Sequence, residues 1–325
     1  RFNLGVSLRE SGRMAEALEQ FDLIIKLTPD DPRPHFDRAL ALLHLGRFAE
    51  GWEAFETRWG LNETSKAKSD APEWQGEDFH GRTLVLYPEQ GFGDTILASR
   101  FLPLVKARGG DVILICKPEL RRLFENLAGV DRLLDPDDQP GTIDFQCPLM
   151  SLPRIFQATP DNLPPPPHLH VPDDARRKIQ PLIEQAGNRF KVGFVWSGSL
   201  TFKGNATRAT SLDRFLELAE VPGIQLYSLQ KGPLEREISD IGAEAVVVDV
   251  GGLVNDFAET AALIEQLDLV IMTDSSVAHL SGALGRPIWN LLNFSPYWLY
   301  RMHGETTPWY PSMTLIRQPC PGDWD

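Results

Sequence analysis

A recurring order of short apolar runs, turns and helices limits this chain to a narrow set of folds. Runs of four to six mostly apolar residues are followed by small polar turns and, in most cases, by stretches with helical periodicity. These runs occupy 83–88, 111–116, 131–134, 142–147, 191–196, 224–229, 245–250, 267–272 and 287–292. Strands that alternate with helices usually pair in parallel, with helices on both faces of the sheet. The pattern therefore predicts an α/β protein.

A proline-rich stretch divides these runs into two series. Residues 163–172 read LPPPPHLHVP, and such a stretch is stiff, extended and poor in backbone donors, which suits a crossing between two lobes. We therefore predict an N-terminal lobe over 81–165 and a C-terminal lobe over 166–325. Parallel sheets bind ligands at the carboxyl ends of their strands, so two such lobes imply a ligand cleft between them.

The first 60 residues repeat themselves with a period of 34. Small residues at Gly5 and Ala39 take equivalent places, where they would let paired helices approach closely. The identical pairs are Leu8 and Leu42, Gly12 and Gly46, Ala15 and Ala49, Glu16 and Glu50, and Phe21 and Phe55. The pattern resembles the tetratricopeptide repeat and predicts helical repeats over 1–60, acting either as a structural cap or as a groove for a peptide or protein. Residues 61–80 have no regular period and are predicted to be a linker.

Composition restricts the classes of function. The net charge is −13 without a basic face, which argues against nucleic acid as a partner. Three cysteines without a CxxC pair suggest neither a zinc site nor a disulfide framework. No apolar stretch approaches the ~20 residues of a membrane span and no signal peptide is visible, so we expect a cytoplasmic location, the inner membrane surface included. Because the chain opens on RFNLGVSLRE, a helical pattern without a Met, we expect it to be part of a longer protein.

The residues that follow the predicted strands are small and polar. They are Glu89 and Asp94 in the first lobe, and Ser197, Gln230, Lys231, Asp274, Ser275 and Ser276 in the second. The last three precede AHLSGALG, which is predicted to be a helix ending at Gly285. Free backbone N–H groups and the positive end of the helix dipole make such a start an anion site, with His279 one turn later on the same face. The alternative is that these residues are helix caps and that His279 is a packing residue.

Cations gather near this predicted anion site. No acidic residue occurs from Gln185 to Leu212, whereas the loop over 197–211 holds Lys203 and Arg208 among glycines and hydroxyl residues. With Lys231 at a neighbouring strand end, they suit a phosphate group. Taken singly, each cation is more often a solvated surface charge.

Two carboxylates in EQGFGD could supply a base on the other side of the cleft. Transfer of a group from a diphosphate to a hydroxyl needs a base that takes the proton of the acceptor. Asp94 is the preferred candidate and Glu89 the reserve, although Asp94 could equally cap the following helix. The dinucleotide motif GxGxxG is absent, since EQGFGD supplies only its GxG part, and a P-loop is absent too.

Several stretches together resemble the heptosyltransferase-like glycosyltransferases, glycosyltransferase family nine, in the branch that carries tetratricopeptide repeats. They are EQGFGDTILASRFLPLVKARG, VGFVWSGS, SLQKGP, DLVIMTDSSVAHLSGALGRPIW and PWYPSMTLIRQ. The resemblance implies a GT-B fold of two Rossmann-like lobes, with a nucleotide-sugar donor bound mainly by the C-terminal lobe. It also implies heptosyl- or hexosyl-type transfer with inversion at the anomeric carbon, and neither a metal nor another cofactor.

The resemblance assigns roles to single residues. Asp94 matches the proposed base of the family, and Lys203 matches the lysine that meets the donor phosphate. The other matches are Lys231, Asp274, Ser275, Ser276 and His279. Relatives usually carry Asp-Trp-Arg-Trp where this chain has Tyr-Trp-Leu-Tyr at 297–300. Two hypotheses follow: a glycosyltransferase whose repeats recruit a glycan or protein acceptor, or a non-catalytic repeat scaffold with a nucleotide-binding domain.

Overall fold

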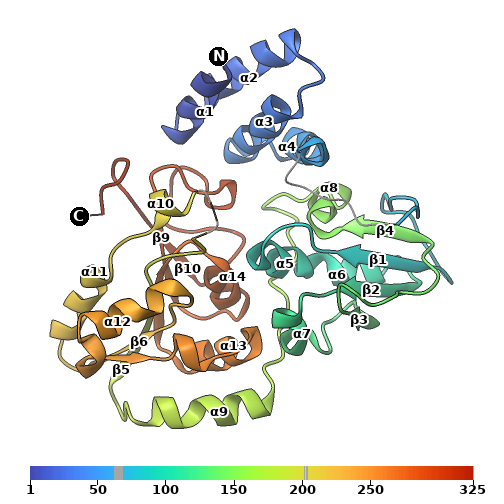
Figure 1. The fold of residues 1–325 in the computed structure, drawn as a ribbon. Helices are drawn as coiled ribbons and strands as arrows, with labels where there is room; N and C mark the ends of the chain where they lie inside the picture. The colour runs from blue at the N-terminus through green and yellow to red at the C-terminus, as the bar shows by residue number, and fades with distance from the viewer. Residues whose placement is uncertain (62–68, 201, 203, 325) are drawn as a thin grey trace.

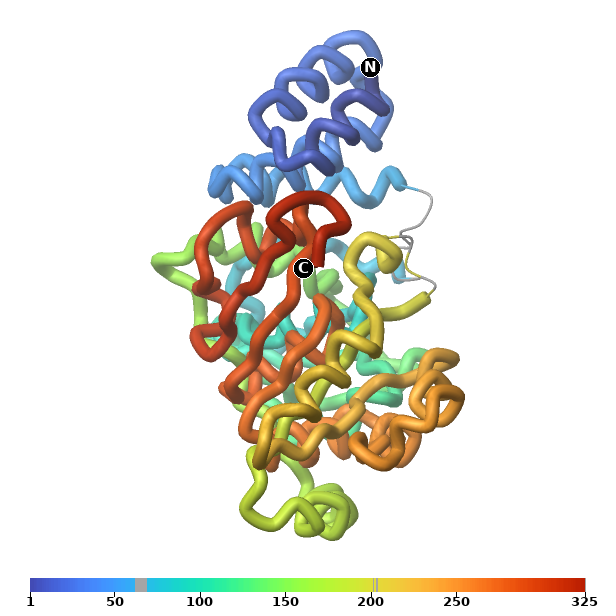
Figure 2. Tube along the Cα trace, turned by 90° about the vertical axis from the view of Figure 1, so that its left-hand side faces the viewer, coloured from blue at the N-terminus to red at the C-terminus, as the bar shows by residue number. Residues whose placement is uncertain are grey.

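The protein consists of a helical segment and two α/β lobes. The computed structural model describes residues 1–61, 69–200, 202 and 204–324. The helical segment lies at one end of the molecule, and the two lobes lie side by side beneath it (Figure 1). A view from the side places the same segment on top of both lobes (Figure 2). The expected division into two lobes with parallel sheets is confirmed.

The sheet of the N-terminal lobe has four strands in the order β3-β2-β1-β4. All neighbouring strands are parallel, as the alternation of strands and helices predicted. The strands are β1 (Thr83–Tyr87), β2 (Asp111–Ile115), β3 (Arg132–Leu134) and β4 (Phe145–Pro148). The central strand β1 is buried along most of its length, and its carboxyl end leads into the loop that carries Glu89 and Asp94.

The sheet of the C-terminal lobe has six strands in the order β10-β9-β8-β5-β6-β7. They are β5 (Phe190–Val195), β6 (Ile224–Ser228), β7 (Val247–Asp249), β8 (Leu269–Thr273), β9 (Ile288–Leu292) and β10 (Met313–Arg317). All neighbours are parallel. The strand order reverses between β5 and β8, and this is the place where a parallel α/β sheet binds ligands. Asp274 directly follows β8 there.

Helices cover the sheets of both lobes. In the N-terminal lobe they are α5 (Phe92–Ala98), α6 (Leu102–Lys106), α7 (Pro118–Phe124) and α8 (Leu152–Ile155). In the C-terminal lobe they are α9 (Asp173–Glu184), α10 (Asn205–Arg208), α11 (Leu212–Leu216), α12 (Arg236–Asp240), α13 (Phe257–Gln266) and α14 (Ser276–Ala283). A 3₁₀ turn over 99–101 separates α5 from α6, because Pro103 lacks a backbone N–H and its ring disturbs a continuous helix.

The helical segment forms two helical hairpins that match the period of 34 in the sequence. Its helices are α1 (Phe2–Glu10), α2 (Met14–Leu27), α3 (Pro32–His44) and α4 (Phe48–Phe55), followed by a 3₁₀ turn over Glu56–Gly60. In the first hairpin, a Cβ atom on Gly5 would lie only 2.6 Å from the ring of Phe21. The equivalent residues of the second hairpin, Ala39 and Phe55, are also buried. Small residues thus occupy the buried places that the repeat pattern gave them.

Residues 69–80 differ from the expected linker. Glu73 forms a parallel bridge with Gln146 of β4, and the indole of Trp74 is 1% exposed. Phe79 is fully buried against the same lobe. Burial of these two aromatic rings attaches this stretch to the N-terminal lobe, because each ring removes a large apolar area from water. Residues 62–68, also within the expected linker, lie outside the described part of the chain.

Trp52 of α4 joins the helical segment to both lobes. Its ring meets that of Trp298 edge-on, with a centroid distance of 5.0 Å, and lies 6.5 Å from that of Trp309. Both partners belong to the C-terminal lobe. The indole Nε1 donates a hydrogen bond of 2.8 Å to the carbonyl of Ala158, which belongs to the N-terminal lobe. One side chain of the helical segment therefore contacts both lobes at once.

Candidate active site

Helices α5 and α14 bring the carboxyl ends of the two sheets together. Each helix follows the central strand of its lobe, β1 or β8, and the two helices pack against each other across the seam between the lobes. A Cβ atom on Gly93 of α5 would lie 2.6 Å from Cδ2 of His279 on α14. The absence of a side chain at Gly93 is what allows this close approach. The seam thus places Asp94 opposite the start of α14.

Asp94 is held in place by both of its carboxylate oxygens. Oδ2 accepts a hydrogen bond of 3.2 Å from the backbone N–H of Gly91, so Asp94 stabilises the start of its own helix. Oδ1 accepts a hydrogen bond of 3.4 Å from the hydroxyl of Tyr297, which comes from the other lobe. Burial raises the pKa of Asp94 to about 6, and the negative charge of Asp274 adds to this rise. The residue is nevertheless partly exposed, so a ligand can reach it.

Asp274 lies on the other side of the seam and is 5% exposed. Its Oδ1 accepts a hydrogen bond of 2.9 Å from the hydroxyl of Tyr300. Its Oδ2 forms an ion pair of 2.8 Å with Nη1 of Arg208. The guanidinium of Arg208 also lies over the ring of Phe202, 4.1 Å from its centroid. Arg208 and Asp274, which were both predicted to belong to the anion site, are therefore in direct contact.

The start of α14 is partly exposed and faces the same seam. Ser275 is the N-cap of the helix, and its Oγ accepts a hydrogen bond of 3.4 Å from the N–H of Val277. Ser276 is the first helical residue, and both serines are partly exposed. Helix N–H groups without a carbonyl partner can bind an anion, and the helix dipole favours negative charge at this end. The geometry is that of an anion site beside a cation, Arg208.

His279 is buried one turn further along α14. Its Nδ1 lies 3.0 Å from the hydroxyl of Tyr310. Burial lowers the pKa of His279 to about 4, so the imidazole is neutral near pH 7. The ring separates α14 from Gly93 and thereby sets the spacing of the seam. The structure gives His279 a packing contact with the N-terminal lobe.

Glu89 lies near Asp94 along the chain but is enclosed. Its side chain is 0% exposed and forms an ion pair of 3.0 Å with Nη2 of Arg58, from the end of the helical segment. Oε1 also accepts a hydrogen bond of 3.2 Å from the N–H of Met150. Burial raises the pKa of Glu89 to about 7. The carboxyl group of Glu89 therefore faces protein atoms.

Ser197, Gln230 and Lys231 connect the strand ends of the C-terminal lobe. The side-chain amide of Gln230 accepts from the N–H of Ser197 and donates to its carbonyl, both at 3.1 Å. Nζ of Lys231 donates to the carbonyls of Gly251 and Val254, at 2.9 and 2.5 Å. These bonds fix the loops beside the start of α14. Lys203 lies outside the residues that the structure describes.

Three tyrosines in this site were not singled out as binding residues from the sequence. Tyr297, Tyr300 and Tyr310 all come from the segment between β9 and β10, and each hydroxyl contacts a candidate residue of the site. The signal was the Tyr-Trp-Leu-Tyr stretch at 297–300, which the sequence showed only as a departure from the usual pattern. The contacts themselves span up to 203 residues of sequence, so local pattern could not give them.

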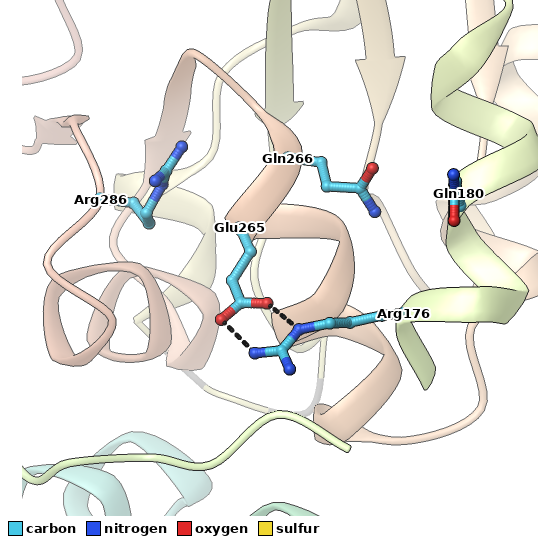
Figure 3. Close-up of a pocket in the computed structure, with 5 residues that line it drawn as sticks. All are labelled: Arg176, Gln180, Glu265, Gln266 and Arg286. Atoms are coloured by element: carbon cyan, nitrogen blue, oxygen red, sulfur yellow. Dashed lines mark hydrogen bonds and ion pairs between the residues drawn. The ribbon is translucent and has the colours of Figure 1, made fainter. Parts of the chain in front are cut away.

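A separate hollow of about 470 Å³ contains none of these candidates. It is lined by side chains of α9, α13 and the turn after α14 (Figure 3). Nε of Arg176 and Oε2 of Glu265 form an ion pair of 2.8 Å across it.

Among all the described residues, no helix is long and apolar enough to cross a membrane, and no group of three His, Cys, Asp or Glu side chains could hold a metal ion.

Comparison with known proteins finds one similar curated sequence and several similar structures. No protein-family model matches the chain. The sequence is 31% identical over 323 residues to Protein FlbA of Caulobacter vibrioides, an alignment that covers 89% of this chain and 52% of FlbA. The chain thus spans about half the length of this relative.

The similar structures are those of glycosyltransferases. A glycosyl transferase family 9 structure from Veillonella parvula has a TM-score of 0.58 at 14% identity, covering 75% of this chain and 88% of its own. The ADP-heptose LPS heptosyltransferase II of E. coli has a TM-score of 0.54 at 14% identity, covering 72% of this chain and 90% of its own. At this level of identity the similarity concerns the fold. The two α/β lobes of this chain therefore have the fold of the glycosyltransferase family 9 heptosyltransferases.

Proposed function

We propose that this chain is an inverting glycosyltransferase that moves a sugar from a nucleotide-sugar donor to a hydroxyl group of a glycan or protein. The observation that carries the proposal is the seam between α5 and α14. It places a carboxylate with a raised pKa, that of Asp94, opposite a helix start flanked by Arg208. The shared fold with family 9 glycosyltransferases supports the same class of reaction.

The diphosphate of the donor would bind at the start of α14. Backbone N–H groups at the partly exposed residues Ser275 and Ser276 would suit its anionic oxygens, and Arg208 could exchange one carboxylate oxygen of Asp274 for a phosphate oxygen. Lys203 would add a second cation from the same loop as Arg208. These groups would stabilise the negative charge that develops on the leaving diphosphate.

Asp94 would act as the general base. The oxygen of the acceptor hydroxyl forms a bond to the anomeric carbon as the bond from that carbon to the diphosphate oxygen breaks. The electron pair of the broken bond leaves with the diphosphate, and the hydroxyl proton passes to the carboxylate of Asp94. A base with a pKa of about 6 is largely ionised at pH 7 and still basic enough to accept this proton. Attack from the side opposite the leaving group inverts the anomeric carbon.

The helical segment would recruit the acceptor. Its two hairpins follow the spacing of tetratricopeptide repeats, and it lies at one end of both lobes (Figure 2). Repeat segments of this kind stack into extended surfaces that bind peptides and proteins. The similarity to FlbA of Caulobacter vibrioides supports a bacterial origin of the chain.

One observation favours a second function, that of a non-catalytic nucleotide-binding scaffold. The hydroxyls of Tyr297 and Tyr300 occupy the carboxylates of Asp94 and Asp274. A transferase needs one further acceptor site on the carboxylate of Asp94 besides those used by Tyr297 and Gly91, and an ionised carboxylate has about four such sites. A scaffold would keep both bonds.

A panel of nucleoside diphosphates and nucleotide sugars separates the two functions. Binding at 100 times Kd stabilises the folded state by about 2.7 kcal/mol, which a thermal unfolding assay detects. We expect the enzyme to release nucleoside diphosphate from at least one sugar nucleotide, and Asp94→Asn to abolish this release while binding survives. Binding without any turnover across the panel would support the scaffold. Full turnover by Asp94→Asn would remove Asp94 from the mechanism.

A further inference from the structure

A buried cluster of charges joins the end of the helical segment to the loop that carries Asp94. Arg58 is 1% exposed, and its guanidinium binds Glu89 at 3.0 Å, Ser151 at 2.8 Å and Glu56 at 2.8 Å. The hydroxyl of Ser151 in turn lies 2.9 Å from Oε2 of Glu56. Arg58 therefore connects the 3₁₀ turn after α4 with the N-terminal lobe through several charged hydrogen bonds.

The same cluster holds the loop after β1. Glu89 is the second residue beyond the strand, and Asp94 follows five positions later at the start of α5. Oε1 of Glu89 accepts hydrogen bonds both from Nη2 of Arg58 and from the N–H of Met150. A buried carboxylate that loses its cation keeps an uncompensated charge, so the surrounding backbone must shift or the group must take up a proton. The position of this loop thus depends on Arg58.

The guanidinium of Arg58 is itself fixed by aromatic rings of the helical segment. Its Cζ lies 4.8 Å from the ring centroid of Phe55 and 4.4 Å from that of Trp59. Such stacking preorganises the planar guanidinium for its hydrogen bonds. Trp52 lies three residues before Phe55 and contacts Trp298. Trp298 lies between Tyr297 and Tyr300 in the sequence, so α4 has a second connection to the site.

We propose that Arg58 is a positioning residue of the active site, acting through Glu89 on the loop that places Asp94; this rests on the proposed transferase function. The helical segment then contributes directly to the geometry of catalysis, besides any binding of an acceptor. Glu89 contacts no substrate, since its side chain is 0% exposed. Its role is to transmit the position of Arg58 to the loop.

The first test compares turnover in full-length variants. We expect Arg58→Met to lower kcat roughly 10- to 100-fold, because a displacement of about 1 Å at a catalytic group can cost this much. The KM of the sugar nucleotide should change by less than about twofold, since the donor binds the C-terminal lobe. The matched control is Arg47→Met, which removes a surface ion pair with Glu50 in the same segment.

Two further variants distinguish positioning from other roles. Glu89→Gln keeps a hydrogen-bonding group of the same shape, so kcat should stay within roughly threefold of the wild type, whereas loss of a base would abolish turnover. In an Asp94→Glu background, which keeps a carboxylate but shifts it, Arg58→Met should cause a smaller further loss of kcat than in the wild type, because both changes act on the position of the same group. Additive losses, or a collapse of turnover in Glu89→Gln, would overturn the proposal.

The second test does not depend on activity. Hydrogen exchange of the peptide over 88–98 reports the stability of the loop and the start of α5. We expect exchange there to be roughly tenfold faster in Arg58→Met and unchanged in Arg47→Met. If Arg58→Met does not fold, Arg58→Lys, which keeps the charge without the fork of donors, should show the same change in milder form. Unchanged exchange would refute the proposal, whereas a wild type that turns over no donor would refute only the transferase function.

Discussion

At the scale of single residues, Asp94 combines a structural and a chemical task. One oxygen stabilises the first turn of α5 and the other meets Tyr297 across the seam. Its pKa of about 6 comes mainly from burial, and the negative charge of Asp274 contributes. When the pKa of a carboxyl group is higher in the folded state than in the unfolded state, ionisation of that group destabilises the folded state. Ionised Asp94 therefore costs stability and provides the base that the reaction needs.

Ionisation of Asp94 should therefore affect both kcat and folding stability, and each effect can be measured as a function of pH. We expect kcat to rise with pH through an apparent pKa of about 6, as Asp94 loses its proton. Stability should move the other way: between about pH 4 and 6 the folded state holds more protons at Asp94 than the unfolded state, so unfolding becomes easier as pH rises. Asp94→Asn should then be more stable than the wild type at pH 7 by on the order of 1 kcal/mol, a value reduced because the residue is partly exposed.

Urea unfolding at pH 4 and pH 7 checks the second effect. The advantage of Asp94→Asn should shrink towards pH 4, where Asp94 is protonated in the folded state and about half protonated in the unfolded state. If Asp94→Asn and the wild type differ in unfolding free energy by the same amount at both pH values, the substitution acts through the helix start and not through the charge.

At the scale of elements, the seam depends on the contact between α5 and α14. Gly93 leaves room for the imidazole of His279, which is held by Tyr310. The approach of the two helices brings the carboxyl ends of β1 and β8 within reach of one ligand.

Gly93→Ala should disturb this contact. The added methyl group would lie 2.6 Å from the ring of His279, and relief of such an overlap in a packed interior costs about 1–3 kcal/mol of stability. We also expect weaker turnover, because α5 moves together with Asp94. Gly252→Ala is the control, since the nearest atom there is the flexible end of Glu235 at 3.3 Å. Thermal unfolding of both variants checks the expectation, and equal effects of the two substitutions would contradict it.

The sequence predicted elements where local pattern decides structure. Apolar runs gave the strands from β1 to β9, and the polar residues after β1 and β8 gave Asp94 and Asp274. Strand β10 was missed because every second residue of MTLIR is exposed or polar, so it has no continuous apolar run.

Long-range contacts were beyond the reach of pattern. Arg58 and Glu89 are 31 residues apart, in a predicted repeat and a predicted loop, and nothing in either stretch indicates the other. Tyr300 reaches Asp274 from a loop on the far side of β9. Such pairs follow from the packing of whole elements, which periodicity and turn chemistry do not specify.

At the scale of the whole molecule, the two lobes are joined at both ends of the seam. The helical segment lies at one end, and α9 lies at the opposite end in both views (Figures 1 and 2). Near α9, Arg122 of the N-terminal lobe forms an ion pair of 2.7 Å with Asp256 of the C-terminal lobe and also binds Asp174. At the other end, Trp52 contacts both lobes.

Trp52→Ala should therefore weaken the whole molecule. Removal of a buried indole leaves a cavity and costs about 3–5 kcal/mol, and here it also removes the hydrogen bond to the N-terminal lobe. Trp289→Ala is the matched control, because Trp289 is 43% exposed. Chemical denaturation of the two variants provides the comparison. A loss for Trp52→Ala no greater than that for the control would show that the contact contributes little.

The buried contacts of Trp52 and Arg58 have a consequence for how the chain is assembled. Buried side chains of the helical segment insert against both lobes and so orient the segment. We expect residues 1–60, supplied as a separate chain, to bind the remainder of the protein through a surface that includes Trp52 and Arg58.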